Sequence, residues 1–142
     1  MNLSEHFTLE ELVASDTAAR KGIDNTPSGR QVQKLTYLAS RLEEVRALVG
    51  PLHVNSGYRS FNLNRAIGSK DTSQHVACEA ADLSSAQYSA LQLCQAVVDS
   101  GIQFDQLIYE FESWMHISFA QGRAPRGSVL TIDKQGVRTG LG

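Results

Sequence analysis

Two stretches of the chain carry apolar residues at every third or fourth position, and this spacing predicts two long helices. The first is expected from about Ser28 to Val49, where Gly50-Pro51 ends it, and the second from about Ser85 to Ser100. We interpret the two apolar stripes as core. They consist of Val32, Leu35, Leu38, Leu42, Val45 and Leu48 in the first helix and of Tyr88, Leu91, Val97 and Val98 in the second.

Short runs of β-forming residues, bounded by turn residues, predict a small sheet. They lie at 52–55, 80–84, 106–110, 114–119 and 129–132. The third and fourth runs are close enough in sequence to form a hairpin. Short helices are predicted after Thr8, which forms a capping box with Glu11, and from Ser60 through Arg65. The pattern is typical of the α+β class, with helices packed on a small antiparallel sheet.

Composition limits the possible functions. A length of 142 residues, with 42% apolar and 20% charged residues, favours a single domain over residues 1–142 with a core of its own. The net charge of −2 gives no basic footprint for nucleic acid or for an anionic membrane. No run of apolar residues is long enough to span a bilayer. The two cysteines, Cys78 and Cys94, are expected to be free thiols.

The most distinctive chemistry lies in two histidines and one aspartate. His75 and Asp82 are seven residues apart, and His116 follows in Trp114-Met115-His116. Two imidazoles and one carboxylate leave a fourth tetrahedral position for water, which is the arrangement of a catalytic zinc site. His75-x-x-Cys78 is also a metal-ligand spacing, so a His/Cys/His site is the alternative.

These residues carry a resemblance to a known family. Ser73, His75, Ala80 and Asp82 fit the pattern S-x-H-x-x-G-x-A-x-D, and Trp114 with His116 fits a downstream W-x-H. From about Leu3 to Leu141 the chain resembles the zinc D-alanyl-D-alanine carboxypeptidases and phage L-alanyl-D-glutamate endopeptidases, which share the hedgehog/DD-peptidase fold. Cys78 stands at the glycine of the pattern. If that position has a positive φ angle, Cys78 strains the turn.

The resemblance also implies catalytic roles. Arg59, in the segment Ser56-Gly57-Tyr58-Arg59, is expected to grip a substrate carboxylate or to steady the oxyanion. In several relatives the general base lies three residues before the last histidine, where this chain has Ser113, which cannot act as a base. Glu110 and Glu112 are the candidates. We favour Glu110, because it ends the strand expected to pair with that of His116, whereas Glu112 falls in the turn.

Two further residues are expected to support the substrate. Ser73 is interpreted as a hydrogen-bond partner of a metal ligand or of the substrate, and Trp114 as a wall of the pocket or as a packing residue. Asp71 and Asp105 are interpreted only as loop and strand-start residues.

By resemblance, the chain is expected to be a zinc metallopeptidase, with Zn²⁺ as cofactor, that hydrolyses peptidoglycan stem peptides as an endolysin-like D,D-carboxypeptidase or endopeptidase. A monomer is expected, with no nucleic-acid or membrane partner. The first residues lack a secretory signal. We therefore expect synthesis in the cytoplasm and action on the cell wall after holin-type release or as part of a virion.

Two alternatives stay open. The fold is also known with a structural zinc in a binding domain, as in hedgehog proteins, and Ser113 and Cys78 are the departures that favour this reading. A D-alanyl-D-alanine dipeptidase is the other alternative, and it would need a closed pocket rather than a groove.

Overall fold

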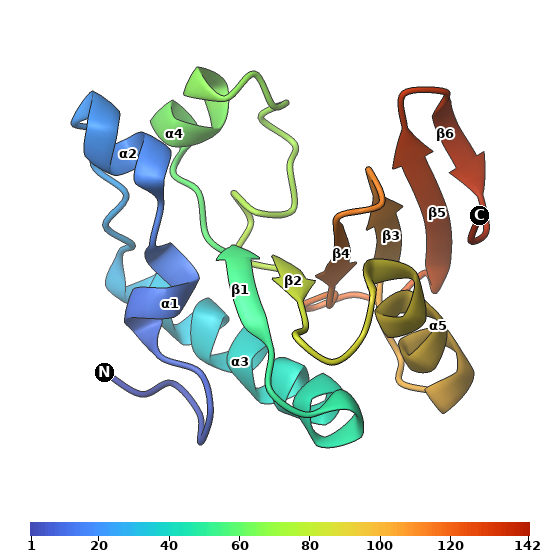
Figure 1. Cartoon of the computed structure of the whole chain (residues 1–142). Helices are drawn as coiled ribbons and strands as arrows, with labels where there is room; N and C mark the ends of the chain where they lie inside the picture. Colours follow the sequence, from blue (N-terminus) through green and yellow to red (C-terminus); the bar gives the residue numbers. More distant parts are fainter.

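The computed structural model describes residues 1–142 and contains five helices and six strands (Figure 1). The strands form one sheet in the order β1-β2-β4-β3-β5-β6. The helices are α1 (Leu9–Val13), α2 (Asp16–Lys21), α3 (Gly29–Val49), α4 (Phe61–Ala66) and α5 (Ala90–Ser100). The strands are β1 (His53–Ser56), β2 (Ala80–Ser84), β3 (Gln106–Glu110), β4 (Trp114–Ser118), β5 (Ser128–Asp133) and β6 (Gly136–Thr139).

Capping residues set where the helices begin. Ser28 caps α3 in a capping box with Gln31, close to the predicted start. The second long helix begins later than predicted, because Ser89 and Gln92 form its capping box. Its buried side consists of Leu93, Cys94 and Val97. The assignment of Tyr88, Leu91 and Leu48 to the core is therefore wrong, and their exposed fractions are 39%, 41% and 44%.

The sheet is mixed, so the prediction of an antiparallel sheet is wrong at one pair of strands. β3 and β4 form the predicted antiparallel hairpin, but β5 pairs with β3 in parallel. The reason lies in the loop after β4. The end of β4 lies beside the start of β3, with Ser118 opposite Gln106, and β5 starts from the same end, with Ser128 opposite Gln106.

Alternation along the strands gives the sheet two different faces. Ala81, Leu83, Met115 and Ile117 belong to the hydrophobic core, together with residues of α3 and α5. Helix α5 packs against α3 and against β3 and β4 (Figure 1). Since successive side chains of a strand point to opposite faces, the residues between these core positions lie on the other face. That face carries polar side chains in the middle of the sheet.

No helix has both the length and the apolar character needed to cross a membrane.

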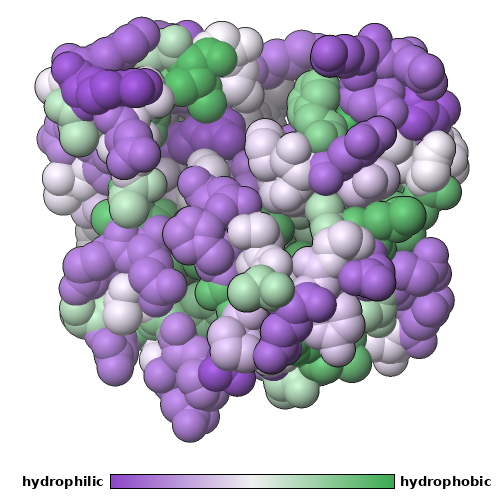
Figure 2. Space-filling view, in the orientation of Figure 1, coloured by the Kyte–Doolittle hydropathy of each residue, from purple (hydrophilic) through white to green (hydrophobic).

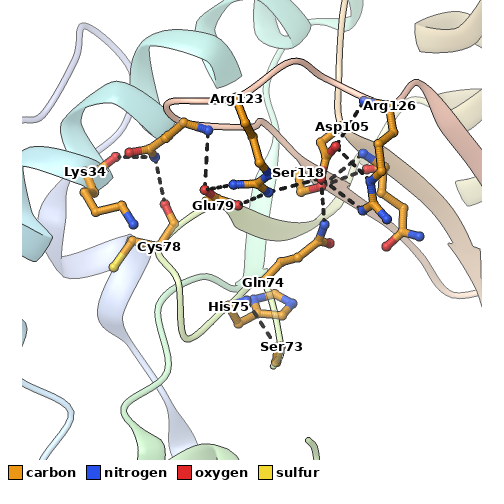
Figure 3. A network of polar contacts seen from close by, with 12 residues as sticks. Lys34, Ser73, Gln74, His75, Cys78, Glu79, Asp105, Ser118, Arg123 and Arg126 are labelled. Atoms are coloured by element: carbon orange, nitrogen blue, oxygen red, sulfur yellow. Dashed lines mark hydrogen bonds and ion pairs between the residues drawn. The ribbon is translucent and has the colours of Figure 1, made fainter. Parts of the chain in front are cut away.

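Two buried acids fasten the loop that joins β4 to β5. Arg123 forms a bidentate pair with Glu79 at 2.7 and 2.9 Å, and Arg126 forms one with Asp105 at 3.0 Å for each bond (Figure 3). Glu79 is 3% exposed and Asp105 is fully buried. Because a buried carboxylate is costly unless it is paired, these contacts hold the loop that sets the direction of β5.

Gly57 permits a close approach between two segments of backbone. A Cβ atom at this position would lie 2.4 Å from the carbonyl oxygen of Leu12, at the end of α1. The same carbonyl accepts a hydrogen bond from the Tyr58 amide at 2.7 Å. The glycine thus lets the segment after β1 lie directly against α1.

Gly57→Ala is expected to lower the free energy of unfolding by about 1–3 kcal/mol, because the added methyl group must displace backbone. Gly29→Ala is the matched control, since a Cβ there has nothing within 4 Å. It should change stability by less than about 0.5 kcal/mol. Urea unfolding of both variants measures the difference. Equal stability of the two variants would show that the approach at Gly57 is not tight.

Asp105 should make stability depend on acid pH. Hydrogen bonds from Arg126 hold the pKa of its carboxyl below the usual range. A lowered folded-state pKa contributes stability above the unfolded pKa of about 3.9, and this is lost as pH falls through the folded-state value. Asp105→Asn should reduce the free energy of unfolding by about 1.5–3 kcal/mol at neutral pH. The difference from wild type should shrink below about pH 4. A difference that stays constant in urea unfolding down to acid pH would contradict this.

Candidate metal centre

Strand register brings two of the three candidate ligands together. In the antiparallel pair of β2 and β4, Asp82 lies directly opposite His116. Side chains opposite each other in such a pair have Cβ atoms about 5 Å apart. The third ligand, His75, comes from the turns that precede β2. All three residues are buried, with exposed fractions of 3% to 6%.

The donor atoms of the three residues converge on one point. Oδ1 of Asp82 lies 3.0 Å from Nδ1 of His116 and 3.2 Å from Nε2 of His75. Each of the three residues offers one donor atom within 4.8 Å of the other two. In a tetrahedral zinc site with bonds of about 2.0–2.1 Å, neighbouring donors are roughly 3.3 Å apart. The observed separations are close to that value.

The remaining ring nitrogens determine where the protons of the histidines lie. Nδ1 of His75 is 2.7 Å from the carbonyl oxygen of Gly57, which can only accept, so Nδ1 carries the proton and Nε2 has a free lone pair. Nε2 of His116 is 2.7 Å from Oε1 of Gln74, which also only accepts, so the free lone pair of His116 is on Nδ1. Both free lone pairs belong to the nitrogens near Asp82. This donor set fits zinc and leaves a position open.

Charge at the site keeps Asp82 ionised. Burial alone would raise the pKa of this carboxyl, but in their protonated, imidazolium form His75 and His116 outweigh burial and hold the pKa of Asp82 well below its usual range. Oδ2 of Asp82 faces Nη2 of Arg59 at 3.5 Å. Asp82 therefore presents one oxygen to the histidines and the other to the arginine.

Arg59 lies beside the centre on the connection between β1 and α4. Its Nε donates to Oγ of Ser56 at 3.1 Å and its Nη1 to Oδ1 of Asn64 at 3.3 Å, which fixes the guanidinium. Burial lowers the pKa of Arg59, while the charges of Asp82 and Glu110 oppose that shift. Arg59 and Asp82 line a cleft of about 340 Å³, with Trp114 on the same cleft.

Of the two candidate bases, Glu110 lies at the centre and Glu112 does not. Oε1 of Glu110 is 3.9 Å from Nδ1 of His116, and Oε2 accepts a hydrogen bond from Nε1 of Trp114 at 3.1 Å. Burial and then the charge of Asp82 raise the pKa of Glu110. Glu112 is exposed in the hairpin turn, at φ 58°. A carboxyl group with a raised pKa is a stronger base than an exposed carboxylate, which suits proton transfer beside a metal site.

Ser73 and Trp114 both lie close to the ligands. Oγ of Ser73 accepts a hydrogen bond from the backbone amide of His75 at 3.2 Å, so it stabilises the turn that carries this ligand (Figure 3). Trp114 contacts Glu110 as described and lines the first cleft.

Cys78 takes no part in the centre. It has a φ angle of 63°, so the residue at the glycine position of the sequence pattern does adopt the left-handed conformation. Its side chain is buried in the hydrophobic core, and burial raises the pKa of the thiol to about 11. The metal-ligand group contains His75, Asp82 and His116, so the His/Cys/His alternative is wrong. Cys78 and Cys94 are both free, as predicted.

The sequence interpretation missed Gln74 and Asp105. Oδ2 of Asp105 accepts a hydrogen bond from Nε2 of Gln74 at 3.1 Å (Figure 3). The oxygen of the same amide lies 2.7 Å from Nε2 of His116. The assignment of Asp105 as only a strand-start residue is thus incomplete. The position of Gln74 between Ser73 and His75 was the one signal available. Gln74 and His116 line a second cleft, of about 350 Å³.

Comparison with known proteins identifies one family. A family model described as Peptidase M15 matches residues 5–118, a range that includes the three candidate ligands, Arg59 and Glu110. No curated protein matches the chain.

Zinc is expected to bind with one ion per chain and to stabilise the fold. Free zinc at about one hundred times its Kd should add about 2.7 kcal/mol to the free energy of unfolding. His116→Ala should lose most of this zinc-dependent gain, and a chelator should abolish it in wild type. His53→Ala is the control, since His53 is exposed on β1. Thermal unfolding with and without zinc measures the effect, and an undiminished gain in His116→Ala would exclude His116 as a ligand.

Proposed function

Because the chain belongs to the peptidase M15 family, whose members are zinc-dependent peptidases, we propose that it hydrolyses peptide bonds in the stem peptides of peptidoglycan. The observation that supports this most strongly is the group of His75, Asp82 and His116 with Glu110 beside it. A buried three-donor set can hold a metal, and a buried carboxyl group next to it can move a proton. Together they meet the chemical needs of amide hydrolysis.

Each residue has a role that follows from its contacts. His75, Asp82 and His116 would hold zinc, which when bound polarises a carbonyl and acidifies water. Glu110 takes a proton from the attacking water and returns it to the leaving amine. Its raised pKa supports the first step, because a carboxylate with a raised pKa is a stronger base than an exposed one and takes the proton of water more readily; the protonated group then donates that proton to the leaving amine. Trp114 holds one carboxylate oxygen of Glu110, which leaves the other toward the centre.

Arg59 positions the substrate. Ser56 and Asn64 orient its guanidinium, and the cleft that it lines gives a peptide room beside the metal centre. A fixed guanidinium matches a carboxylate or a developing oxyanion better than a mobile lysine would. The remaining hydrogen-bond donors of Arg59 are available to a carboxylate or carbonyl of the stem peptide.

The clefts favour an endopeptidase over a dipeptidase. One cleft contains Asp82 and Arg59, and the other contains His116 and Ser73, so the centre has space on two sides. The surface is hollowed near the top of the view in Figure 2, and hydrophilic residues dominate this face. A peptide that extends in both directions from its scissile bond fits this arrangement. A free dipeptide would need a closed pocket, and a purely structural zinc would not need a base beside it.

Glu110→Gln is expected to lower kcat on purified cell walls by about 10²–10⁴, the usual contribution of a general base, without loss of zinc. Glu112→Gln is the matched control and should keep wild-type activity, because its side chain lies in the exposed turn. Clearing of a cell-wall suspension measures the rate, and zinc content is measured on the same samples. Loss of activity in Glu112→Gln with retention in Glu110→Gln would show that the base is Glu112.

Mass spectra of the released muropeptides identify the bond. Fragments cut inside the stem peptide support an endopeptidase, and release of terminal D-alanine alone supports a carboxypeptidase. A zinc-loaded wild type that releases nothing from any muropeptide would contradict catalysis and favour the binding-domain alternative.

A further inference from the structure

We infer that Gln74 is a positioning residue, which fixes the tautomer and ring orientation of His116 so that Nδ1 faces the metal centre. This inference rests on the role of His116 as a metal donor in the proposed function. It concerns a residue that neither binds metal nor reacts. A chain of hydrogen bonds starts at Arg126 and ends at His116, and each of its links restricts the next.

The first link fixes Asp105. Nε and Nη2 of Arg126 each donate to a different oxygen of Asp105 at 3.0 Å, and the Arg126 backbone amide donates to Oδ1 at 3.1 Å. Arg123 approaches Oδ2 at 3.4 Å. With this number of donors around it, the buried carboxyl group is an ionised acceptor and has no proton to give.

The second link fixes the amide of Gln74. An ionised carboxylate can only accept, so the group that faces Asp105 at 3.1 Å must be the NH₂ of Gln74 (Figure 3). The amide oxygen is therefore turned toward His116. The hydrogen bond to Asp105 thus determines which end of the Gln74 amide is the oxygen and which is the nitrogen.

The third link fixes His116. The oxygen of Gln74 accepts at 2.7 Å, so Nε2 of His116 carries a proton, and in the neutral imidazole Nδ1 is then bare. The opposite tautomer would be harmful. With a proton on Nδ1, His116 would donate to Oδ1 of Asp82, 3.0 Å away, and that internal hydrogen bond would occupy two metal donors at once.

The two histidines differ in how they are controlled. A backbone carbonyl, that of Gly57, fixes His75, and no side-chain substitution removes it. A side chain fixes His116, so its control can be tested by substitution. Outer hydrogen bonds of this kind commonly contribute 10–100-fold to metal affinity.

The test uses the chain of residues 1–142. In the metal-free wild type, long-range ¹H–¹⁵N NMR of the imidazoles should show His116 protonated on Nε2 and His75 protonated on Nδ1. Gln74→Met keeps the length of the side chain and removes the acceptor. It should move His116 toward the Nδ1-protonated form, and zinc affinity measured against a competing chelator should fall about 10–100-fold.

Two further variants make the result specific. Gln74→Glu keeps an acceptor for Nε2 of His116, so it should retain the wild-type tautomer even though its charge faces Asp105. Gln95→Met is the matched control, because Gln95 also donates its amide to an aspartate, Asp99, at 2.9 Å, on the exposed surface of α5. It should change neither the tautomer nor the affinity.

The outcomes separate this inference from the proposed function. Two results would overturn the role of Gln74. One is a wild-type His116 that is protonated on Nδ1. The other is a Gln74→Met variant in which both the tautomer of His116 and the zinc affinity are unchanged. Neither result depends on catalysis, because both are read without substrate. If the tautomer responds as expected and cell walls are still not cleaved, the positioning role stands and the proposed peptidase activity fails.

Discussion

The pairing of β2 with β4 determines both the packing of the core and the geometry of the metal centre. It sets Asp82 opposite His116 and, on the reverse face, places Ala81, Leu83, Met115 and Ile117 in the core. A slip of one residue in either strand would turn the ligand of that strand into the core and its apolar residues to the site face. The energy of burying the core therefore also fixes the geometry of the metal centre. Folding and site formation are in this sense a single event.

The polar groups of the buried metal centre are all hydrogen-bonded to their surroundings. Each histidine uses its outer nitrogen for a hydrogen bond and keeps its inner nitrogen bare. Every buried side-chain nitrogen and oxygen atom has a hydrogen-bond partner. Well-satisfied outer contacts make the inner donors rigid, and rigid donors lose little entropy when a metal binds. Arg59 and Glu110 add one positive and one negative side chain at the rim, where a polar substrate would enter.

Local patterns in the sequence predicted most of the fold. Capping residues such as Ser28 and strand runs such as 106–110 are set by neighbours in the chain, and they agree with the structure. The parallel placement of β5 depends on pairs between Arg123, Arg126 and two distant acids, which no local pattern reveals. The three metal ligands could be predicted because they belong to the sequence motifs of the family. The roles of Gln74 and Asp105 could not be predicted, because they depend on a contact between residues 31 positions apart in the sequence. The roles given to Arg59, Ser73, Trp114 and Glu110 remain predictions.

A zinc-loaded crystal, with anomalous difference density recorded at the zinc absorption edge, tests directly whether His75, Asp82 and His116 share one ion. We expect one peak per chain, within about 2.0–2.2 Å of Nε2 of His75, an oxygen of Asp82 and Nδ1 of His116, with no fourth protein ligand. A peak elsewhere in the molecule, coordination of His116 through Nε2, or a fourth protein donor that closes the site would contradict it.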